Sequence, residues 1–297
     1  MSASLPIWRS MLFVPAHVEK FVAAAHKRGA DAYILDLEDA VPADQKAQAR
    51  SMLANGAAQV SASGGAALVR INAPAEMLEA DLDAAVMPAV HALVLPKVND
   101  AQTVQDIAAR IDVLEAQRGM PRGHTLLIAQ IEDVRALPQL DAIAASHPRL
   151  LGMSLGSEDF SASAGMAPIP EALFAPNQQI VFACRRAGIL PFGFPASIAD
   201  YSDIERFGRT IRLASQLGFV GAFCVHPTQV SVLNREFAPS ADDIADAQGT
   251  LAAFAAAQAE GRAAATYKNK MVDPPVVARA EEILRRAQGL ATSGHGT

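Results

Sequence analysis

The sequence has few cysteines, and the two it has lie far apart. Cys184 and Cys224 are the full complement in 297 residues, and neither stands in a CxxC or CxxH arrangement. A disulfide framework or a cysteine-rich zinc site needs several closely spaced cysteines, so both are excluded. We expect both side chains to be buried as small hydrophobic groups.

Positive charge is also scarce. The chain carries 25 lysine and arginine residues against 31 aspartate and glutamate residues, for a formal net charge of −6, and it has no basic block. Nucleic-acid binding needs a surface rich in lysine and arginine. The composition therefore argues against a nucleic-acid partner.

Long apolar runs and targeting signals are missing as well. No stretch reaches the roughly 18 apolar residues that a membrane-spanning helix needs. The first residues show neither a basic segment ahead of an apolar run nor a small-residue cleavage site. The sequence predicts no membrane span and no signal peptide, and the cytoplasm is the expected compartment.

Eight short apolar runs alternate with longer segments of helical periodicity. Most of the short runs are continuously apolar, as expected for parallel strands that are covered on both faces. Eight β–α repeats indicate an α/β fold, a closed (β/α)8 TIM barrel. A doubly wound open sheet is the alternative, but the chain has neither GxGxxG nor a P-loop. The runs are 10–15, 32–39, 66–74, 91–98, 124–133, 150–160, 190–197 and 221–227.

The pattern changes after residue 235. Ser240 precedes acidic residues and an alanine-rich segment, which is typical of a helix N-terminus. A loop and a final amphipathic helix follow. We therefore divide the chain into a TIM-barrel catalytic domain, residues 1–235, and a C-terminal helical extension, residues 236–297. The extension is expected to pack on the barrel, or on a neighbouring subunit, as a lid.

Polar residues gather at the carboxyl ends of the predicted strands, where a TIM barrel places its active site. Several have simpler explanations when taken singly. Asp39 and Asp133 could cap the next helix, Lys97 could be a solvated charge, and His226 could be a hydrogen-bonded core residue. Their convergence on one rim favours a site. The residues are Asp36, Glu38, Asp39, Arg70, Asn72, Lys97, Gln130, Glu132, Asp133, Ser157, Glu158, Asp159 and His226.

Converging carboxylates call for a cation. Glu132 and Asp159 follow adjacent predicted strands and offer the hard oxygen ligands that suit Mg²⁺. Zinc would prefer histidine or cysteine, which are scarce here. Arg70 offers a planar fork for a substrate carboxylate. A metal and an arginine together would hold an α-keto acid and stabilise charge on its oxygens.

Eight segments, taken in order, resemble the citrate lyase β-subunit-like branch of the HpcH/HpaI aldolase superfamily. Within that branch, the malyl-CoA and citramalyl-CoA lyases are the most similar. Each motif alone is weak, but the ordered set is specific and runs from about Arg9 to the last helix. The segments are RSMLFVP, LDLEDAV followed by AR, VRIN, LPKV, IE, MSLGSEDF, VHPTQV with FAPS, and YKNKMVD.

The resemblance implies a Mg²⁺-dependent TIM barrel, trimeric or hexameric, that breaks or forms a carbon–carbon bond in a 3-hydroxyacyl-CoA. Carried over by motif, Glu132 and Asp159 would bind the metal, Glu132 and Arg70 would act in catalysis, and Arg70 would hold the keto acid. Asp273 resembles a catalytic acid/base that a neighbouring subunit supplies; without the resemblance it is expected to cap a helix. Residues implied in substrate binding are Arg70, Phe13, Arg9, Gly156, Ser157 and Glu158.

The acids of LDLED are expected to lie around the metal site without binding the metal. Asp36, Glu38 and Asp39 would hold metal-bound waters or orient Arg9 and Lys97. Strand alternation places Asp36 and Glu38 on the barrel side and Asp39 on the other side.

The match departs from the family pattern on the thioester side. Ala16 stands where glycine is usual, Gly193 where aspartate is usual, and Ala222 where lysine is usual. The metal and arginine positions are kept, so the metal-dependent lyase class is favoured over any one thioester. The alternatives are a citrate lyase β subunit acting on a citryl thioester with an acyl carrier protein, an aldolase acting on free keto acids, a thioesterase of the same family, and a metabolite-binding barrel.

Overall fold

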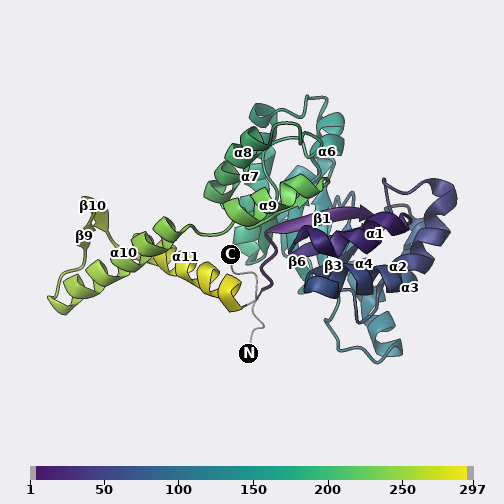
Figure 1. Cartoon of the computed structure of the whole chain (residues 1–297), viewed down its shortest axis with the longest axis horizontal. Helices are drawn as coiled ribbons and strands as arrows, with labels where there is room; N and C mark the ends of the chain where they lie inside the picture. Colours follow the sequence, from purple (N-terminus) through teal and green to yellow (C-terminus); the bar gives the residue numbers. More distant parts are fainter. Residues whose placement is uncertain (1–4, 293–297) are drawn as a thin grey trace. The chain divides into compact units, whose positions relative to one another are not determined.

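The structure is a computed structural model that describes residues 5–292. The chain divides between Arg235 and Glu236 into two compact units. The barrel unit is coloured from purple to green in Figure 1, and the C-terminal unit from green to yellow. Each unit has its own hydrophobic cluster.

Eight parallel strands form a nearly closed barrel, which confirms the predicted fold class. Their order is β7-β6-β5-β4-β3-β2-β1-β8, and β7 meets β8 through a bridge between Phe192 and Gly221. Beside this bridge, Gly193 N–H donates to Gly221 O at 2.9 Å and Val220 N–H donates to Pro191 O at 3.1 Å. The strands are β1 (Ser10–Pro15), β2 (Ala32–Asp36), β3 (Ala66–Arg70), β4 (Ala92–Leu95), β5 (Leu126–Ile131), β6 (Leu150–Leu155), β7 (Leu190–Phe192) and β8 (Ala222–Cys224).

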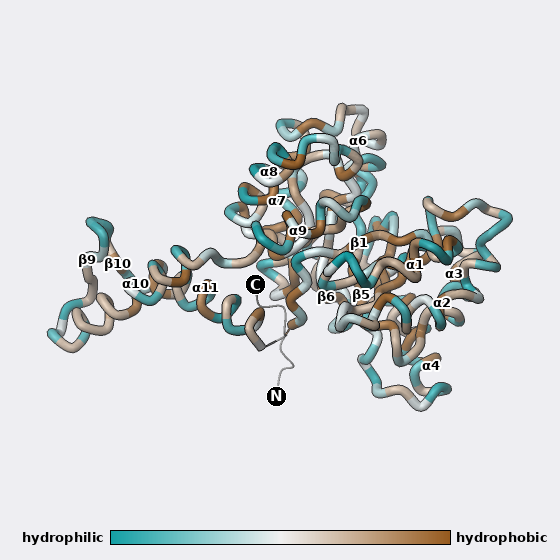
Figure 2. Tube along the Cα trace, in the orientation of Figure 1, coloured by the Kyte–Doolittle hydropathy of each residue, from teal (hydrophilic) through white to brown (hydrophobic). Residues whose placement is uncertain are grey.

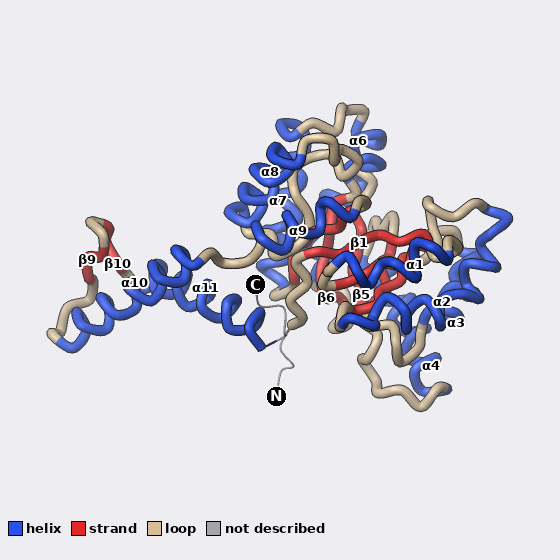
Figure 3. The backbone as a smooth tube through the Cα atoms, viewed as in Figure 1, coloured by secondary structure: helices blue, strands red, loops and turns tan. Residues whose placement is uncertain are grey.

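Helices surround the strands of the barrel unit (Figure 3). Some begin at side-chain caps: Asp100 accepts from Thr103 N–H, and Asp203 from Arg206 N–H. Helix α7 ends at Gly188, whose φ of 72° favours glycine. The helices are α1 (Glu19–Ala25), α2 (Lys46–Val60), α3 (Ala75–Ala85), α4 (Ala101–Gln117), α5 (Leu140–Ala144), α6 (Ser157–Ala164), α7 (Pro170–Ala187), α8 (Ile204–Leu217) and α9 (Pro227–Glu236), with 3-10 helices at His26–Arg28, Ala43–Gln45, Ser61–Ser63 and Val134–Gln139.

Apolar side chains fill the inside of the barrel. Ile34, Leu68 and Ile128 are fully buried there, and β1 is mainly brown, the hydrophobic colour, in Figure 2. Burying such side chains contributes roughly 1.5–3 kcal/mol each. Further along the same strands the residues become polar, since β2 ends at Asp36 and β3 ends at Arg70. This change places the polar residues at the carboxyl end of the barrel.

The two cysteines fulfil the sequence expectation. Cys184 and Cys224 are both buried and free, and burial raises the pKa of the Cys184 thiol to about 12. Among residues 5–292, no helix is long and apolar enough to cross a membrane.

The C-terminal unit contains two helices and a hairpin. Helix α10 (Ala241–Ala259) begins at a capping box between Ser240 and Asp243, and α11 (Pro274–Thr292) ends the described chain. The segment between them, expected to be a loop, forms strands β9 (Ala265–Tyr267) and β10 (Lys270–Val272). Lys268 and Asn269 make the turn with φ of 47° and 60°, the left-handed values that two-residue hairpins favour.

Candidate active site

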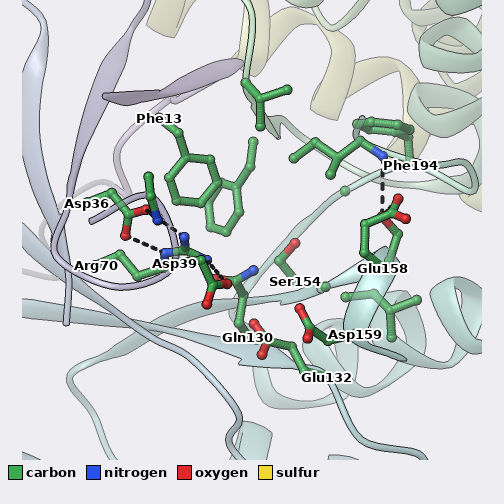
Figure 4. Close-up of a pocket in the computed structure, with 18 of the residues that line it drawn as sticks. Phe13, Asp36, Asp39, Arg70, Gln130, Glu132, Ser154, Glu158, Asp159 and Phe194 are labelled. Atoms are coloured by element: carbon green, nitrogen blue, oxygen red, sulfur yellow. Dashed lines mark hydrogen bonds and ion pairs between the residues drawn. The ribbon is translucent and has the colours of Figure 1, made fainter. Parts of the chain in front are cut away.

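A cavity of about 480 Å³ opens at the carboxyl end of the barrel strands (Figure 4). Most of its polar side chains come from β2, β3, β5, β6, the residues just after them and the start of α6, whereas β1, β8 and the loop after β7 contribute apolar ones. A site at this end agrees with the general behaviour of TIM barrels. The polar lining residues are Asp36, Asp39, Arg70, Gln130, Glu132, Ser154, Ser157, Glu158 and Asp159.

Arg70 lies within a group of carboxylates. Its Nε and Nη2 donate to the two oxygens of Asp36, each at 2.7 Å. Its Nη1 lies 3.0 Å from Glu38 Oε2 and 3.7 Å from Asp39 Oδ2. Burial alone would lower the pKa of Arg70, but these carboxylates raise it. The guanidinium also stacks on Phe13, 4.6 Å from the ring centroid, so its plane is fixed on two sides.

The acids of LDLED therefore contact cations. Glu38 joins Arg70 to Lys97, whose Nζ donates to Glu38 Oε1 at 3.1 Å. Burial raises the pKa of Glu38. The expectation that Asp39 faces away from the barrel is wrong, because β2 ends at Asp36 and strand alternation stops there. Asp39 lines the cavity beside Arg70.

Glu132 is a buried acid of the cavity. Its Oε2 has no hydrogen-bond partner within residues 5–292. Gly156 packs closely against it, since a Cβ at Gly156 would lie 2.5 Å from Glu132 Cγ. Burial, together with the charges of Glu38 and Asp159, raises the pKa of Glu132 to about 8. Without a bound cation, the negative charge of ionised Glu132 has little positive charge nearby to balance it.

Glu132 and Asp159 are suited to hold Mg²⁺. Their carboxylates lie next to each other in Figure 4, one following β5 and the other in the first turn of α6. In the described part of the chain, no three histidine, cysteine, aspartate or glutamate residues form a metal-binding group. Two carboxylates completed by water and substrate oxygens is the usual arrangement for Mg²⁺. The orphaned oxygen of Glu132 fits the same ion.

The start of α6 joins the site to the loop after β7. Glu158 Oε1 accepts from Ser197 Oγ at 2.6 Å. Ser157 Oγ accepts from Ile198 N–H at 3.3 Å. Since Gly156, Ser157, Glu158 and Ile198 all line the cavity, these bonds hold one of its walls in place.

Comparison with known proteins identifies the family to which the chain belongs. Residues 9–227 match the model of the HpcH/HpaI aldolase/citrate lyase family. The chain belongs to this family. It is 32% identical over 283 residues to citrate lyase subunit beta of Leuconostoc mesenteroides subsp. cremoris, covering 94% of this chain and 93% of that one. It is 33% identical over 302 residues to L-malyl-CoA/beta-methylmalyl-CoA lyase of Rhodobacter capsulatus, covering 92% and 91%.

Solved structures support the same assignment of this HpcH/HpaI family member. The CitE protein of Mycobacterium tuberculosis in complex with magnesium, acetoacetate and coenzyme A is 30% identical. It superposes with a TM-score of 0.73 over 97% of this chain and 99% of that chain. The chain is thus an enzyme of the carbon–carbon lyase class, as predicted.

Arg9 does not lie in the cavity, so the prediction that it binds substrate is wrong. It precedes β1, and its Nε and Nη2 donate to Asp31, which precedes β2, at 2.8 and 2.9 Å. Both residues are therefore at the amino ends of their strands, opposite the site. Arg9 cannot be oriented by the acids of LDLED, because Asp31 already holds it.

We expect Asp31→Asn to weaken the fold and leave the site unchanged. Asp31 and Arg9 are almost fully buried, and removing one charge of a buried pair leaves the other uncompensated, at a cost of about 3 kcal/mol. Urea unfolding gives the stability, and assays well below the transition give activity. A change in keto acid affinity beyond about threefold would contradict this structural role.

Asp273 belongs to the C-terminal unit. It follows β10, and its Oδ1 accepts from Val276 N–H at 3.2 Å in the first turn of α11. This is the geometry of a helix cap, which the sequence also allowed. Its role as an acid/base in a neighbouring subunit stays a prediction.

Several lining residues, among them Ser154, Phe194 and Phe223, were not proposed from the sequence, whereas Gln130 was among the predicted rim residues. Gln130 and Ser154 face the cavity from paired positions on β5 and β6, and Gln130 Oε1 has no hydrogen-bond partner in the described chain. Polar residues inside apolar strands were the available signal. Phe194 and Phe223 also line the cavity, but aromatic residues in buried strands are normally core residues.

Other rim residues have structural roles. Asn72 donates through Nδ2 to Asp81 at 2.7 Å. Asp133 caps the following 3-10 helix, as the simpler explanation allowed. His226 stacks on Tyr201 with ring centroids 4.5 Å apart.

The raised pKa of Glu132 predicts a pH-dependent stability of the metal-free protein. Below its ordinary value of 4.5 the carboxyl is protonated in both the folded and the unfolded state. As pH rises from there to about 8, the unfolded chain ionises first, so the folded wild type loses stability relative to Glu132→Gln. With a chelator present, we expect the variant to be more stable at pH 9 by on the order of 2 kcal/mol. Thermal unfolding at pH 5 and pH 9 tests this, and a difference independent of pH would contradict it.

Proposed function

We propose that the chain is a Mg²⁺-dependent lyase that cleaves, or forms, a 3-hydroxyacyl-CoA such as malyl-CoA or citramalyl-CoA. The products of cleavage would be an acyl-CoA and a 2-keto acid. The observation that carries the proposal is the buried carboxylate of Glu132, whose Oε2 has no hydrogen-bond partner within residues 5–292, beside Asp159 in the cavity that Arg70 also lines. Similar proteins named as malyl-CoA lyases, and one crystallised with magnesium and coenzyme A, support it.

Glu132 and Asp159 would hold Mg²⁺, which when bound polarises the substrate oxygen and stabilises negative charge on it. Arg70 would bind the carboxylate of the keto acid through the donors that Asp36 leaves available. Asp36 fixes the guanidinium plane by two parallel hydrogen bonds. Substrate therefore meets an arginine whose orientation is set before binding, which lowers the cost of ordering it.

Cleavage follows from this arrangement. A base removes the proton from the 3-hydroxyl group, and the O–H electron pair forms the carbonyl of the keto acid. The C2–C3 bond breaks, and its electron pair passes to C2 as the enolate of the thioester. Protonation of C2 then gives the acyl-CoA. We assign proton transfer to Asp273 of a neighbouring subunit in a homotrimer or homohexamer, and condensation is the reverse sequence.

The test is turnover of a panel of 3-hydroxyacyl-CoA thioesters by purified protein with Mg²⁺. We expect keto acid and acyl-CoA in equal amounts, no turnover with a chelator, and none by Glu132→Gln. Failure to cleave any member of the panel would refute the proposal. Release of free CoA without keto acid would indicate a thioesterase, and cleavage restricted to a carrier-protein thioester would indicate a citrate lyase β subunit.

A further inference from the structure

The charge and polarity of the cavity restrict the keto acid. We infer that the site handles monocarboxylic 2-oxo acids, with hydrogen or an alkyl group on the keto carbon, and rejects dicarboxylic 2-oxo acids. The inference rests on the proposed function, since it takes a keto acid as the ligand. It separates the two kinds of relative, because a citryl thioester releases a dicarboxylic oxo acid whereas a malyl or citramalyl thioester releases a monocarboxylic one.

Positive charge in the cavity is limited. Within residues 5–292, Arg70 is the only cationic side chain that lines it, and it faces the carboxylates of Asp36, Asp39, Glu132, Glu158 and Asp159. Even with a divalent cation bound, negative groups outnumber positive ones. One substrate carboxylate can be accepted at the metal and Arg70, but a second would lie among like charges.

Most of the hydrogen-bond donors of Arg70 are already used by carboxylates of the protein. Asp36 takes two of its donors, and Glu38 lies 3.0 Å from Nη1. Each guanidinium has five N–H donors, so few remain after these contacts. They suffice for one carboxylate and leave no second bidentate position.

Two lysines near Arg70, Lys97 and Lys46, are paired with groups of the protein. Lys97 is paired with Glu38 at 3.1 Å. Lys46 donates to the carbonyls of Leu37 and Glu38 and to Asn72 Oδ1, each at 2.7 Å. Neither lysine lines the cavity. A distal carboxylate would therefore find no cation on the part of the barrel wall that residues 5–292 form.

The rest of the wall is apolar. Phe13, Phe194, Phe223, Ile198 and Val225 line the cavity, and Phe13 and Phe194 lie across it from Glu132 and Asp159 (Figure 4). The rings of Phe13 and Phe223 meet edge to face at 5.5 Å. An unpaired carboxylate buried against such a surface is costly. A hydrogen atom or an alkyl group there loses nothing and buries apolar area.

The test compares three keto acids with Mg²⁺-saturated protein by calorimetry. Pyruvate is the small monocarboxylate, oxaloacetate carries a second carboxylate, and 4-methyl-2-oxopentanoate places an isopropyl group of similar size where that carboxylate stands. We expect both monocarboxylates to bind at least about tenfold more tightly than oxaloacetate, since like-charge contacts oppose the wrong ligand.

The outcomes separate the two proposals. Oxaloacetate binding as tightly as 4-methyl-2-oxopentanoate, with pyruvate also bound, would overturn the inference and leave the proposed function standing. Absence of Mg²⁺-dependent binding by all three would overturn the proposed function itself, and the inference with it.

A variant that removes one carboxylate from the cavity tests whether charge repulsion causes the preference for monocarboxylic keto acids. Asp39 lines the cavity 3.7 Å from Arg70, and Asp39→Asn removes one negative charge at constant shape. We expect the preference for 4-methyl-2-oxopentanoate over oxaloacetate to fall by roughly threefold or more. Glu171→Gln, an exposed position on α7, is the matched control and should leave the ratio unchanged. A ratio that Asp39→Asn also leaves unchanged would overturn the electrostatic basis.

Discussion

Arg70→Lys is expected to lower kcat by about 10²–10³-fold while the protein stays folded. Lysine keeps one charge, but it cannot make the paired bonds to Asp36 or present a planar fork to a carboxylate. Removing one well-placed donor to a developing oxyanion typically costs this much. Steady-state kinetics on the cleaved thioester give kcat, and Mg²⁺ titration by calorimetry shows whether the metal site is intact.

The matched comparison is Lys97→Gln. Lys97 contacts the same acid, Glu38, but its side chain is 45% exposed and does not line the cavity. We expect kcat to change by less than about tenfold there, because the contact with substrate remains. Equal losses of kcat in the two variants would mean that Arg70 contributes only positive charge at the rim and makes no specific contact with the substrate.

Mixing two inactive variants is expected to restore activity. Asp273→Asn lacks the proposed acid/base and Glu132→Gln lacks a metal ligand, so each alone should lose at least about 10²-fold in kcat. If Asp273 serves the neighbouring subunit, a site is intact wherever the metal ligands of one variant meet Asp273 of the other. Random mixing in a closed ring gives roughly a quarter of such sites.

The control for mixing is a chain that carries both substitutions. Combined with either single variant, it should restore nothing, because no pair then supplies both groups. Refolding or co-expression produces the mixed oligomers, and kcat per subunit is the readout. Activity of the Asp273→Asn and Glu132→Gln mixture no higher than that of the parents would place Asp273 in its own subunit's site, or outside catalysis.

The barrel was predictable because its strands are buried on both faces. Segments such as 92–95 and 126–129 are continuously apolar, and eight such runs alternating with helical segments leave few other folds. The pairing of Glu132 with Asp159 followed from the same pattern. Glu132 directly follows β5, and Asp159 follows the neighbouring β6 in the first turn of α6, so their side chains meet at one rim.

The wrong or missing predictions also have physical causes that lie in the sequence pattern. Arg9 lies one residue before β1, and a short motif does not show at which end of a strand a side chain will point. Asp39 was placed by strand alternation, which stops where β2 ends at Asp36. The β9–β10 hairpin was missed because its turn is Lys268–Asn269 and lacks the glycine that usually marks such turns. The roles of Phe194 and Phe223 in lining the cavity were missed because aromatic residues in buried strands are normally core residues. Phe13 was the one aromatic residue assigned to the site.

A crystal structure of the protein soaked with Mg²⁺ and pyruvate tests the central claim most directly. The account predicts one octahedral ion coordinated by Glu132 and Asp159 at about 2.1 Å. It also predicts that pyruvate chelates the ion with its carboxylate near Arg70. An ion bound elsewhere while Glu132 and Asp159 hold only water, or pyruvate bound without any metal, would contradict it.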